Sequence, residues 1–403
     1  MISKKLVAAS ILAAMGTSSA YALDPIKVGQ WDLTLSGSVN GYYTQTKCDQ
    51  AGVAASGTLG GLLTPCGGVA NSQSAANVQN GLLPGFLVFT AATKQNGYDL
   101  KGVISIDPGT TNSANNGLAQ TVGDNRRVYL TVGTDSMGTF KIGRDIGMFG
   151  QNAILNDMSL LAVGGGAGLN GAINTTLGSI GSGYIYTEFQ PQVSYTSPNM
   201  GGLQLSAGIF QPRRPLENNT GAFANETNSP ALQAMATYTV GSAKLWGALI
   251  NQKVKANAAG VRDLDTSGYE AGGTIGFGAL QLTGNYFSGS GLGTGIIGVG
   301  GFDSAGNKRD SDGYLAQATY KIGDTKLGIN YGESQLDRTS ADTAATNPTD
   351  MLKTNKQAVL GVYHNLTPSL TIAAEYIDQK QDYQFGARQS KSNTFAVGAI
   401  LFF

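Results

Sequence analysis

The sequence of 403 residues predicts an all-β fold, a transmembrane antiparallel β-barrel of about 16 strands. Three observations support this prediction. Many segments alternate between apolar and polar residues, their connections are alternately short and long, and the final segment is the apolar run FAVGAILFF, Phe395 to Phe403. An exposed apolar edge strand promotes aggregation, whereas a strand in a closed barrel has both edges paired and can present its outer face to lipid.

The first residues have the pattern of a secretory signal peptide. Lys4 and Lys5 precede a short apolar run, which is followed by Ala20-Tyr21-Ala22. The run is too short to span a bilayer, so we predict a signal peptide over 1–22, cleaved after Ala22, and an exported mature chain 23–403. Removing the two lysines from the 26 basic residues leaves 24 against 26 acidic, a formal net charge of −2. That charge does not favour a nucleic-acid partner.

Strand periodicity is clearest in residues 31–46. Leu33, Leu35, Val39 and Tyr43 occupy odd positions, while the even positions are mostly polar. The same period of two returns in 98–106, 203–209 and 280–286, which predicts strands with one apolar and one wet face. No later segment offers the roughly 18 uninterrupted apolar residues of a membrane-spanning helix. The 58 glycines show no collagen-like period.

Short and long connections alternate between the predicted strands. The short ones are turn-rich and lie at 94–97, 135–138, 197–202, 240–243, 276–279, 323–325 and 365–369. The long, Gly- and Asn-rich ones are expected at about 47–83, 108–124, 145–186, 211–230, 251–268, 288–312, 333–355 and 378–392. This asymmetry is typical of outer-membrane barrels, with turns in the periplasm and loops outside. A barrel of about 16 strands is wide enough for an aqueous channel, so we expect a pore.

Three segments then resemble a known family. Arg127 to Arg144, Gln192 to Gln211 and Leu360 to Tyr376 are similar to hairpins of the Gram-negative general porins of the neisserial and burkholderial type. The resemblance implies a homotrimer in outer-membrane lipid that passes small hydrophilic solutes and ions by passive diffusion. It implies that the third extracellular loop, 145–186, folds into the barrel. It also implies that Phe403 is the signal read by the barrel-assembly machinery.

By this resemblance, acidic residues on the third loop face basic residues on the wall and form a constriction. A charged ring in a narrow pore filters ions electrostatically. The candidates are Arg127, Lys141, Arg144, Asp145, Asp157 and Glu188. Arg127 and Glu188 have the parity of the polar face. Alternatively, Arg144 only anchors the root of the loop and Asp145 caps it.

The third loop departs from the family pattern. It lacks the usual acidic cluster and carries the apolar residues Ile154, Leu155, Met158, Leu160, Leu161 and Val163. These side chains either pack the loop against the wall or line a less polar eyelet suited to a particular solute. We favour packing, because a wet pore penalises exposed leucines. A channel selective for one small organic solute remains open, as does a plugged barrel that serves as a surface receptor or anchor.

The two cysteines, Cys48 and Cys66, both lie in the long first loop, and an even pair in an exported chain predicts a structural disulfide. His364, the single histidine, falls beside a predicted periplasmic turn and not at the outer rim, so we expect no enzyme. Residues 303–312 could bind calcium weakly through carboxylates, but they lack EF-hand spacing, and a solvated loop is the preferred interpretation. No metal or cofactor is therefore expected.

Overall fold

The computed structural model describes residues 24–50, 74–112, 121–166, 175–213, 227–255, 262–344, 351–385 and 389–403. The predicted signal peptide with its cleavage residue Ala22, and Cys66, lie outside these ranges. Within them, no helix is long and apolar enough to cross a membrane.

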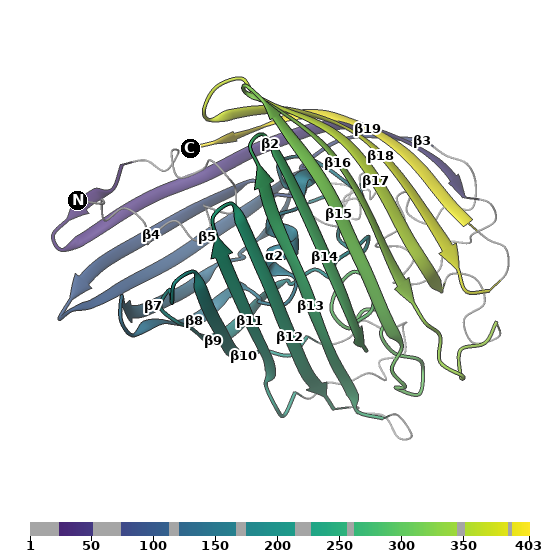
Figure 1. Ribbon diagram of the computed structural model, residues 1–403, viewed down its shortest axis with the longest axis horizontal. Helices are drawn as coiled ribbons and strands as arrows, with labels where there is room; N and C mark the ends of the chain where they lie inside the picture. The colour runs from purple at the N-terminus through teal and green to yellow at the C-terminus, as the bar shows by residue number, and fades with distance from the viewer. Residues whose placement is uncertain are drawn as a thin grey trace.

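Sixteen long strands form one closed antiparallel barrel, as the sequence predicts. They are β2 (Trp31–Gln50), β4 (Phe86–Gln95), β5 (Tyr98–Asn112), β7 (Val128–Thr134), β8 (Gly138–Ile146), β9 (Phe189–Thr196), β10 (Leu203–Phe210), β11 (Ala231–Val240), β12 (Ala243–Val254), β13 (Leu264–Phe277), β14 (Leu280–Ser290), β15 (Asp310–Ile322), β16 (Thr325–Leu336), β17 (Leu352–Asn365), β18 (Leu370–Tyr383) and β19 (Gln389–Phe402). Figure 1 shows them as a ring of tilted strands.

Three short strands and two short helices complete the described elements. Strand β1 (Ile26–Val28) pairs with the start of β2, β3 (Ser74–Gln79) with the later part of β2, and β6 (Thr121–Asp124) with the end of β5. The helix α2 (Gln151–Leu155) and the 3-10 turn η3 (Met158–Leu161) follow β8. In Figure 1, α2 lies behind the front strands, within the ring.

The barrel closes where the last strand meets the first. Strand β19 pairs with β2 from Ser390↔Gln50 to Phe402↔Ser38. The Phe403 N–H donates to the Gly37 carbonyl at 3.0 Å, and the Gly37 N–H donates to the Phe403 carbonyl at 2.7 Å. Both edges of the sheet are therefore paired, which is the condition for a sheet to span lipid.

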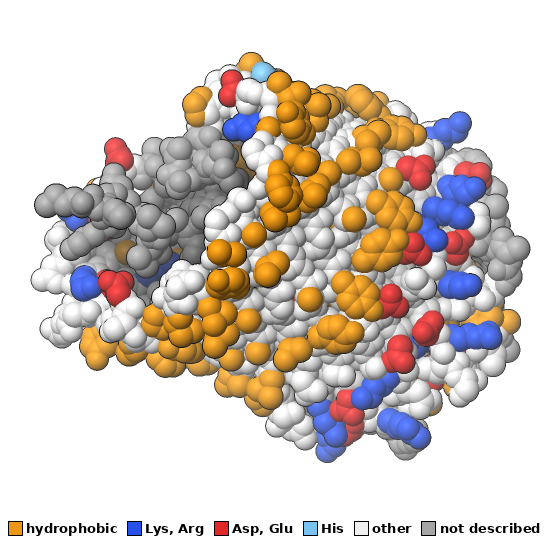
Figure 2. Space-filling model, viewed as in Figure 1, with side chains coloured by type: hydrophobic (Ala, Val, Ile, Leu, Met, Phe, Trp, Pro, Cys, Tyr) orange, Lys and Arg blue, Asp and Glu red, His pale blue; other side chains and the backbone are white. Residues whose placement is uncertain are grey.

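The two faces of the wall differ as the alternation predicts. On β2, Val39 points outward and is 59% exposed, whereas its neighbours Ser38 and Asn40 point inward and are buried. Figure 2 shows groups of apolar side chains spread over the outer surface of the strands. The outer face thus suits hydrocarbon, and the inner face is polar.

Several strands run further than the sequence pattern indicates. Strand β2 continues to Gln50, β18 to Tyr383, and β19 begins at Gln389, although loops were expected over 47–83 and 378–392. Both faces of these extensions are rich in polar residues, so hydrophobic alternation cannot mark them. Backbone pairing continues there without it.

Candidate functional site

The third loop connects β8 to β9, and its described residues, 147–166 and 175–188, lie inside the barrel. Its first part is fixed by side chains of the wall. The Gln233 Oε1 on β11 accepts hydrogen bonds from the backbone N–H groups of Met148, at 2.8 Å, and Phe149, at 3.0 Å. The Glu270 carboxylate on β13 accepts from the Gly150 N–H at 2.9 Å. These donors precede a short helix, and the wall supplies the acceptors they would otherwise lack.

The loop then crosses to the opposite wall. The Met158 N–H donates to Gln317 Oε1 on β15 at 2.7 Å. The Val163 and Gly164 N–H groups donate to Glu375 Oε2 on β18, at 3.0 and 2.7 Å. Contacts on β11, β13, β15 and β18 therefore span about half of the barrel circumference, and the loop obstructs the lumen.

The returning limb of the loop approaches the wall closely. The Gly183 N–H donates to Ser334 Oγ on β16 at 2.9 Å. At Gly332, two residues earlier on β16, an added Cβ would lie 1.8 Å from the Ser182 carbonyl oxygen. Only glycine allows this approach between strand and loop.

An apolar core holds the two limbs together. Its buried members are Leu82, Ile146, Ala153, Ile154, Leu160, Leu177, Ile180, Tyr184, Leu315 and Leu352. Met158 and Val163 belong to a second apolar cluster against the wall. Four of the six apolar loop residues singled out in the sequence thus lie in these cores. Leu155 and Leu161 pack against them from half-buried positions.

A cavity of about 280 Å³ lies between this core and the wall. Its lining includes the charged residues Asp107, Asp124, Arg126, Arg127, Arg144, Asp145 and Glu188. It also includes the apolar residues Leu82, Leu83, Pro84, Ile154, Leu155, Leu160, Leu177, Ile180, Ile296 and Val299. The apolar residues of the third loop therefore do both things that the sequence left open: they pack in a core, and some of them also line the cavity.

Aromatic rings support two of the cavity arginines. The Arg126 guanidinium lies 5.5 Å from the centroid of Phe189, and that of Arg127 lies 5.2 Å from the centroid of Phe86. Such cation–π contacts restrict the guanidinium planes without neutralising their charge.

Every carboxylate of the cavity has a basic partner. The pairs are Asp107 with Arg127 at 3.7 Å, Asp124 with Arg126 at 3.4 Å, Asp145 with Lys141, and Glu188 with Arg213. Arg144 has no ion pair within the residues that the structure describes, and its buried Nε has no hydrogen-bond partner there. Among the described residues, three arginines and four carboxylates line the cavity. With Lys141 and Arg213, which pair with two of these carboxylates from outside the lining, five described bases stand against four acids, and Arg144 is the unpaired one.

Five of the six predicted constriction residues gather here. Arg127, Arg144, Asp145 and Glu188 line the cavity, and Lys141 contacts it through Asp145. Asp157 does not line it.

The Asp157 side chain turns into the loop instead. It is buried, and its oxygens accept hydrogen bonds from the Ser159 N–H at 2.9 Å, the Ser179 N–H at 2.8 Å and the Tyr184 hydroxyl at 2.7 Å. Burial raises the pKa of Asp157, and these hydrogen bonds oppose the shift. The carboxylate joins the two limbs of the loop.

Several cavity residues escaped the sequence argument. Asp107 shares the inward parity of Val103 and Ser105, so the alternation contained a signal for it. Arg126 adjoins a predicted residue. Tyr186, and the segments around Leu83 and Ile296, had no signal, because their positions depend on irregular loops.

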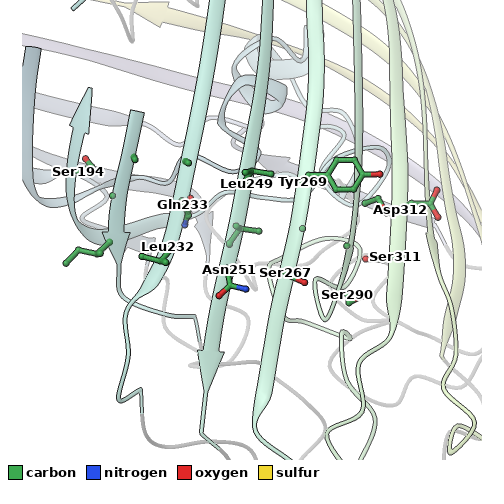
Figure 3. A pocket seen from close by; sticks show the side chains of 18 of the residues that line it. Ser194, Leu232, Gln233, Leu249, Asn251, Ser267, Tyr269, Ser290, Ser311 and Asp312 are labelled. Atoms are coloured by element: carbon green, nitrogen blue, oxygen red, sulfur yellow. The ribbon is translucent and has the colours of Figure 1, made fainter. Parts of the chain in front are cut away.

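A second hollow, of about 1280 Å³, lies on the outside of the barrel across β8 to β15. Figure 3 shows Leu232, Leu249 and Tyr269 along this stretch of wall, with Asn251 and Asp312 among the polar residues at its border. The apolar members are exposed on the outward face. This hollow is a concave part of the outer surface and not the channel.

Two other predicted sites are the cysteine pair and the acidic segment 303–312. Cys48 is buried on β2, and its pairing with Cys66 stays a prediction because Cys66 is outside the described ranges. Among the described residues, no group of three or more His, Cys, Asp or Glu is placed to hold a metal ion. The Asp303 carboxylate accepts from the N–H groups of Ala305 and Asn307, each at 2.9 Å.

A closed barrel of 16 strands with a polar lumen and an apolar exterior is the architecture of an outer-membrane diffusion channel. The sequence gives the same result. Residues 8–384 match the family model described as Gram-negative porin, so the chain belongs to the Gram-negative porin family. It is an outer-membrane channel for the passive diffusion of solutes. Among curated proteins, none matches the sequence.

Solved structures share the fold at low identity. The outer-membrane channel DcaP of Acinetobacter baumannii is 18% identical, with a TM-score of 0.68, covering 94% of this chain and 100% of that one. The anion-selective porin from Comamonas acidovorans is 15% identical, with a TM-score of 0.61, covering 93% and 100%. A trimer form of OmpT from Vibrio cholerae is 15% identical, with a TM-score of 0.53, covering 93% and 99%.

Proposed function

We propose that this porin passes small hydrophilic solutes and ions through a constriction formed by the third loop and the arginine side of the cavity, and that it prefers anions. The observation that carries the proposal is the unequal pairing of charges. Each cavity carboxylate is engaged by a base, and Arg144 is left without an anionic partner among the described residues. In a narrow, low-dielectric passage such a charge attracts anions and repels cations.

The wall on the turn side of the constriction supports the same preference. Lys101, Lys141, Lys244 and Lys326 lie on strands with the parity of the inward face. Of these, Lys101 and Lys141 flank Thr131 across neighbouring strands, which concentrates positive charge on one side of the lumen. The inward carboxylates Glu270 and Glu375 are engaged by backbone N–H groups of the loop.

The constriction residues are therefore Arg126, Arg127, Arg144 and Glu188, with Lys141 paired to Asp145. Asp157 shapes the loop and does not face the solute. The anion-selective porin from Comamonas acidovorans shares the fold and is a precedent for this property.

The assembly is proposed to be a homotrimer in outer-membrane lipid, with Phe403 as the signal for barrel insertion and Cys48–Cys66 as a disulfide of the first loop. The trimer form of OmpT is a precedent for the oligomer. The channel carries out no chemical reaction. Native mass spectrometry of the detergent-extracted protein tests the oligomer.

Reversal potentials in a KCl gradient across a planar bilayer test the preference. We expect the wild-type channel to reverse toward the chloride equilibrium potential, because the excess charge at the constriction is positive. Arg144→Gln is expected to move the reversal potential toward zero. Arg338→Gln, at an exposed arginine that does not line the cavity, is expected to leave it unchanged.

Asp157→Asn separates the two roles of that residue. A constriction carboxylate increases anion selectivity when it is neutralised, whereas a carboxylate inside the loop leaves selectivity unchanged, which is the expected result. Cation selectivity in the wild type would contradict the proposal. Absence of conductance steps would instead favour a plugged barrel acting as a receptor or anchor.

A further inference from the structure

The proposed function leaves the solute class open, and the lining of the cavity combines charged with apolar residues. Resting on that function, we infer that the cavity is a binding site for amphipathic organic monoanions: a carboxylate on the arginine side joined to a compact ring or short aliphatic group on the apolar side. The site makes the porin selective among anions and not merely between anions and cations.

The anionic end of the site is formed around Tyr186. This side chain lines the cavity, and no hydrogen bond of its hydroxyl is found within the described residues. Burial raises the pKa of Tyr186, and the nearby charges of Arg126, Arg213 and Arg144 oppose that shift, whereas Asp124 adds to it. The hydroxyl therefore stays protonated and lies in the field of three guanidinium groups. A carboxylate placed there receives charge-assisted hydrogen bonds from arginine and one from the phenol.

The position of Tyr186 is set by the backbone. Its N–H donates to the Gly295 carbonyl at 2.7 Å, which brings the loop after β14 against the end of the third loop. Ile296 and Val299 of that loop consequently reach the cavity. The contact joins the apolar and the charged sides into one site.

The apolar end comes from two surfaces. The third loop contributes Leu155 and Leu160, and the loop after β14 contributes Ile296. Leu155 and Ile296 are half-buried, so part of their apolar surface is open to the cavity. Covering that surface with a hydrocarbon group releases water, at roughly 25 cal/mol per Å². A chloride or acetate ion cannot gain this contribution.

Size and charge narrow the ligand class. A volume of about 280 Å³ lies just below the range for small-molecule sites, roughly 300–1,000 Å³. That volume suits a carboxylate with a six-membered ring. Of the three arginines among the described lining residues, Arg126 and Arg127 are paired with Asp124 and Asp107, so only Arg144 is open to a ligand carboxylate and the second charge of a dianion such as succinate has no unpaired base to meet. A single charge is therefore favoured.

Block of the chloride current in planar bilayers tests the inference with the full-length wild-type protein. The blockers are cyclohexanecarboxylate, acetate, succinate and the neutral cyclohexylmethanol. We expect cyclohexanecarboxylate to half-block at a concentration at least about tenfold below that of acetate or succinate, since added apolar groups in a pocket change affinity by roughly 10- to 200-fold. Cyclohexylmethanol is expected not to block.

Two variants assign the ends of the site. Leu155→Asn is expected to raise the half-blocking concentration of cyclohexanecarboxylate about tenfold without changing that of acetate. The double variant Arg126→Gln, Arg144→Gln is expected to raise both values. Leu366→Asn, at an exposed turn, is the matched control and should change neither.

The outcomes are distinct. Conductance steps with equal block by acetate and cyclohexanecarboxylate would overturn the inference and leave the porin function intact. Stronger block by succinate would overturn it in favour of a polar dianion site. Block by cyclohexylmethanol equal to that by the acid would refute the arginine end. If the wild-type protein shows no conductance, the proposed function fails, and the inference fails with it.

Discussion

The barrel wall and the third loop are built on different principles. The wall is a continuous ladder in which neighbouring strands pair over as many as 13 successive positions, as β19 does with β2. The loop has few regular elements, and wall side chains such as Gln233, Glu270 and Glu375 fix its course by accepting its backbone N–H groups. Most individual side chains of the wall are therefore replaceable. The loop depends on particular atoms.

The wall and the loops also have different roles: the wall provides stability in the membrane, and the loops determine selectivity. Closure and the apolar exterior keep the cylinder in the membrane, whereas the loops determine what remains open inside it. Substitutions at loop contacts should therefore have larger effects than substitutions at outward wall positions. Four experiments test this comparison, beginning with the largest expected effect.

The ion pair between Arg309, after β14, and Asp342, after β16, fixes two other loops. The Arg309 Nε and Nη2 donate to the two Asp342 oxygens at 2.9 and 2.7 Å, and the side chains are 5% and 0% exposed. Asp342→Ala leaves a buried guanidinium without its carboxylate, which is expected to cost about 3–5 kcal/mol of local stability. Limited proteolysis of the loops in detergent measures it. Asp337→Ala, at an exposed carboxylate nearby, is the control.

The same pair predicts a pH dependence. Burial acts to raise the pKa of Asp342, but the hydrogen bonds and charge of Arg309 outweigh it, and the pKa lies below its ordinary value. A lowered folded pKa means that the stabilisation is complete above the unfolded pKa of about 3.9 and is lost as the pH falls through the folded value. Protease resistance of these loops should decline below about pH 4 in the wild type. A decline of the same size in Asp342→Ala would contradict this assignment.

Glu375 fixes the third loop to β18. Its oxygens accept from the Val163 and Gly164 N–H groups and from the Tyr363 hydroxyl, the last at 2.6 Å. Glu375→Leu removes these acceptors and is expected to cost the loop about 3 kcal/mol, because two of the bonds hold the loop and each contributes roughly 1.5 kcal/mol at the lower end for a charged acceptor. The loop should then leave the lumen part of the time, giving larger and noisier single-channel conductance.

A control variant is available on the same strand. Asp378 is exposed and has the outward parity of Tyr376, so Asp378→Leu should leave conductance unchanged. Unaltered conductance in Glu375→Leu would show that the loop is held by its apolar core alone.

Two glycine substitutions compare the wall and the loop directly. Gly332→Ala places a Cβ against the Ser182 carbonyl and is expected to destabilise the loop by about 1–3 kcal/mol through overpacking. At Gly41 on β2, nothing lies within 4 Å of an added Cβ, so Gly41→Ala should be neutral or stabilising by up to about 1 kcal/mol. Thermal unfolding in detergent with single-channel recordings measures both. Equal effects would remove the proposed distinction.

Much of the wall could be predicted from the sequence because a closed sheet imposes a period of two wherever one face meets hydrocarbon. That constraint correctly placed residues such as Val39 outside and Asn40 inside. It failed at the extension of β18 to Tyr383, where both faces are polar. In that extension only backbone pairing defines the strand, and the side chains show no alternation from which it could be predicted.

The interior was less accessible to sequence reasoning. Arg127 and Glu188 were identified by parity, since they adjoin strands. Asp157 has the same chemistry but sits where the loop folds back on itself, and its oxygens bind the Ser159 and Ser179 N–H groups. Tyr186 reaches the cavity through a backbone contact with a loop more than 100 residues away in the chain. No local pattern encodes such a contact.

The seam between β2 and β19 also orders events during folding. Inside the barrel it joins the Thr46 and Thr394 hydroxyls at 2.8 Å, two residues separated by 348 positions. The entropic cost of closing a loop rises by only about 0.6 kcal/mol for each doubling of its length. Pairing two strands this far apart in the chain is therefore not prohibitively costly at equilibrium. In kinetic terms, however, a pairing of such high sequence separation forms late. Until it forms, the nascent sheet has two open edges, and this interval is when the chain is most exposed to aggregation.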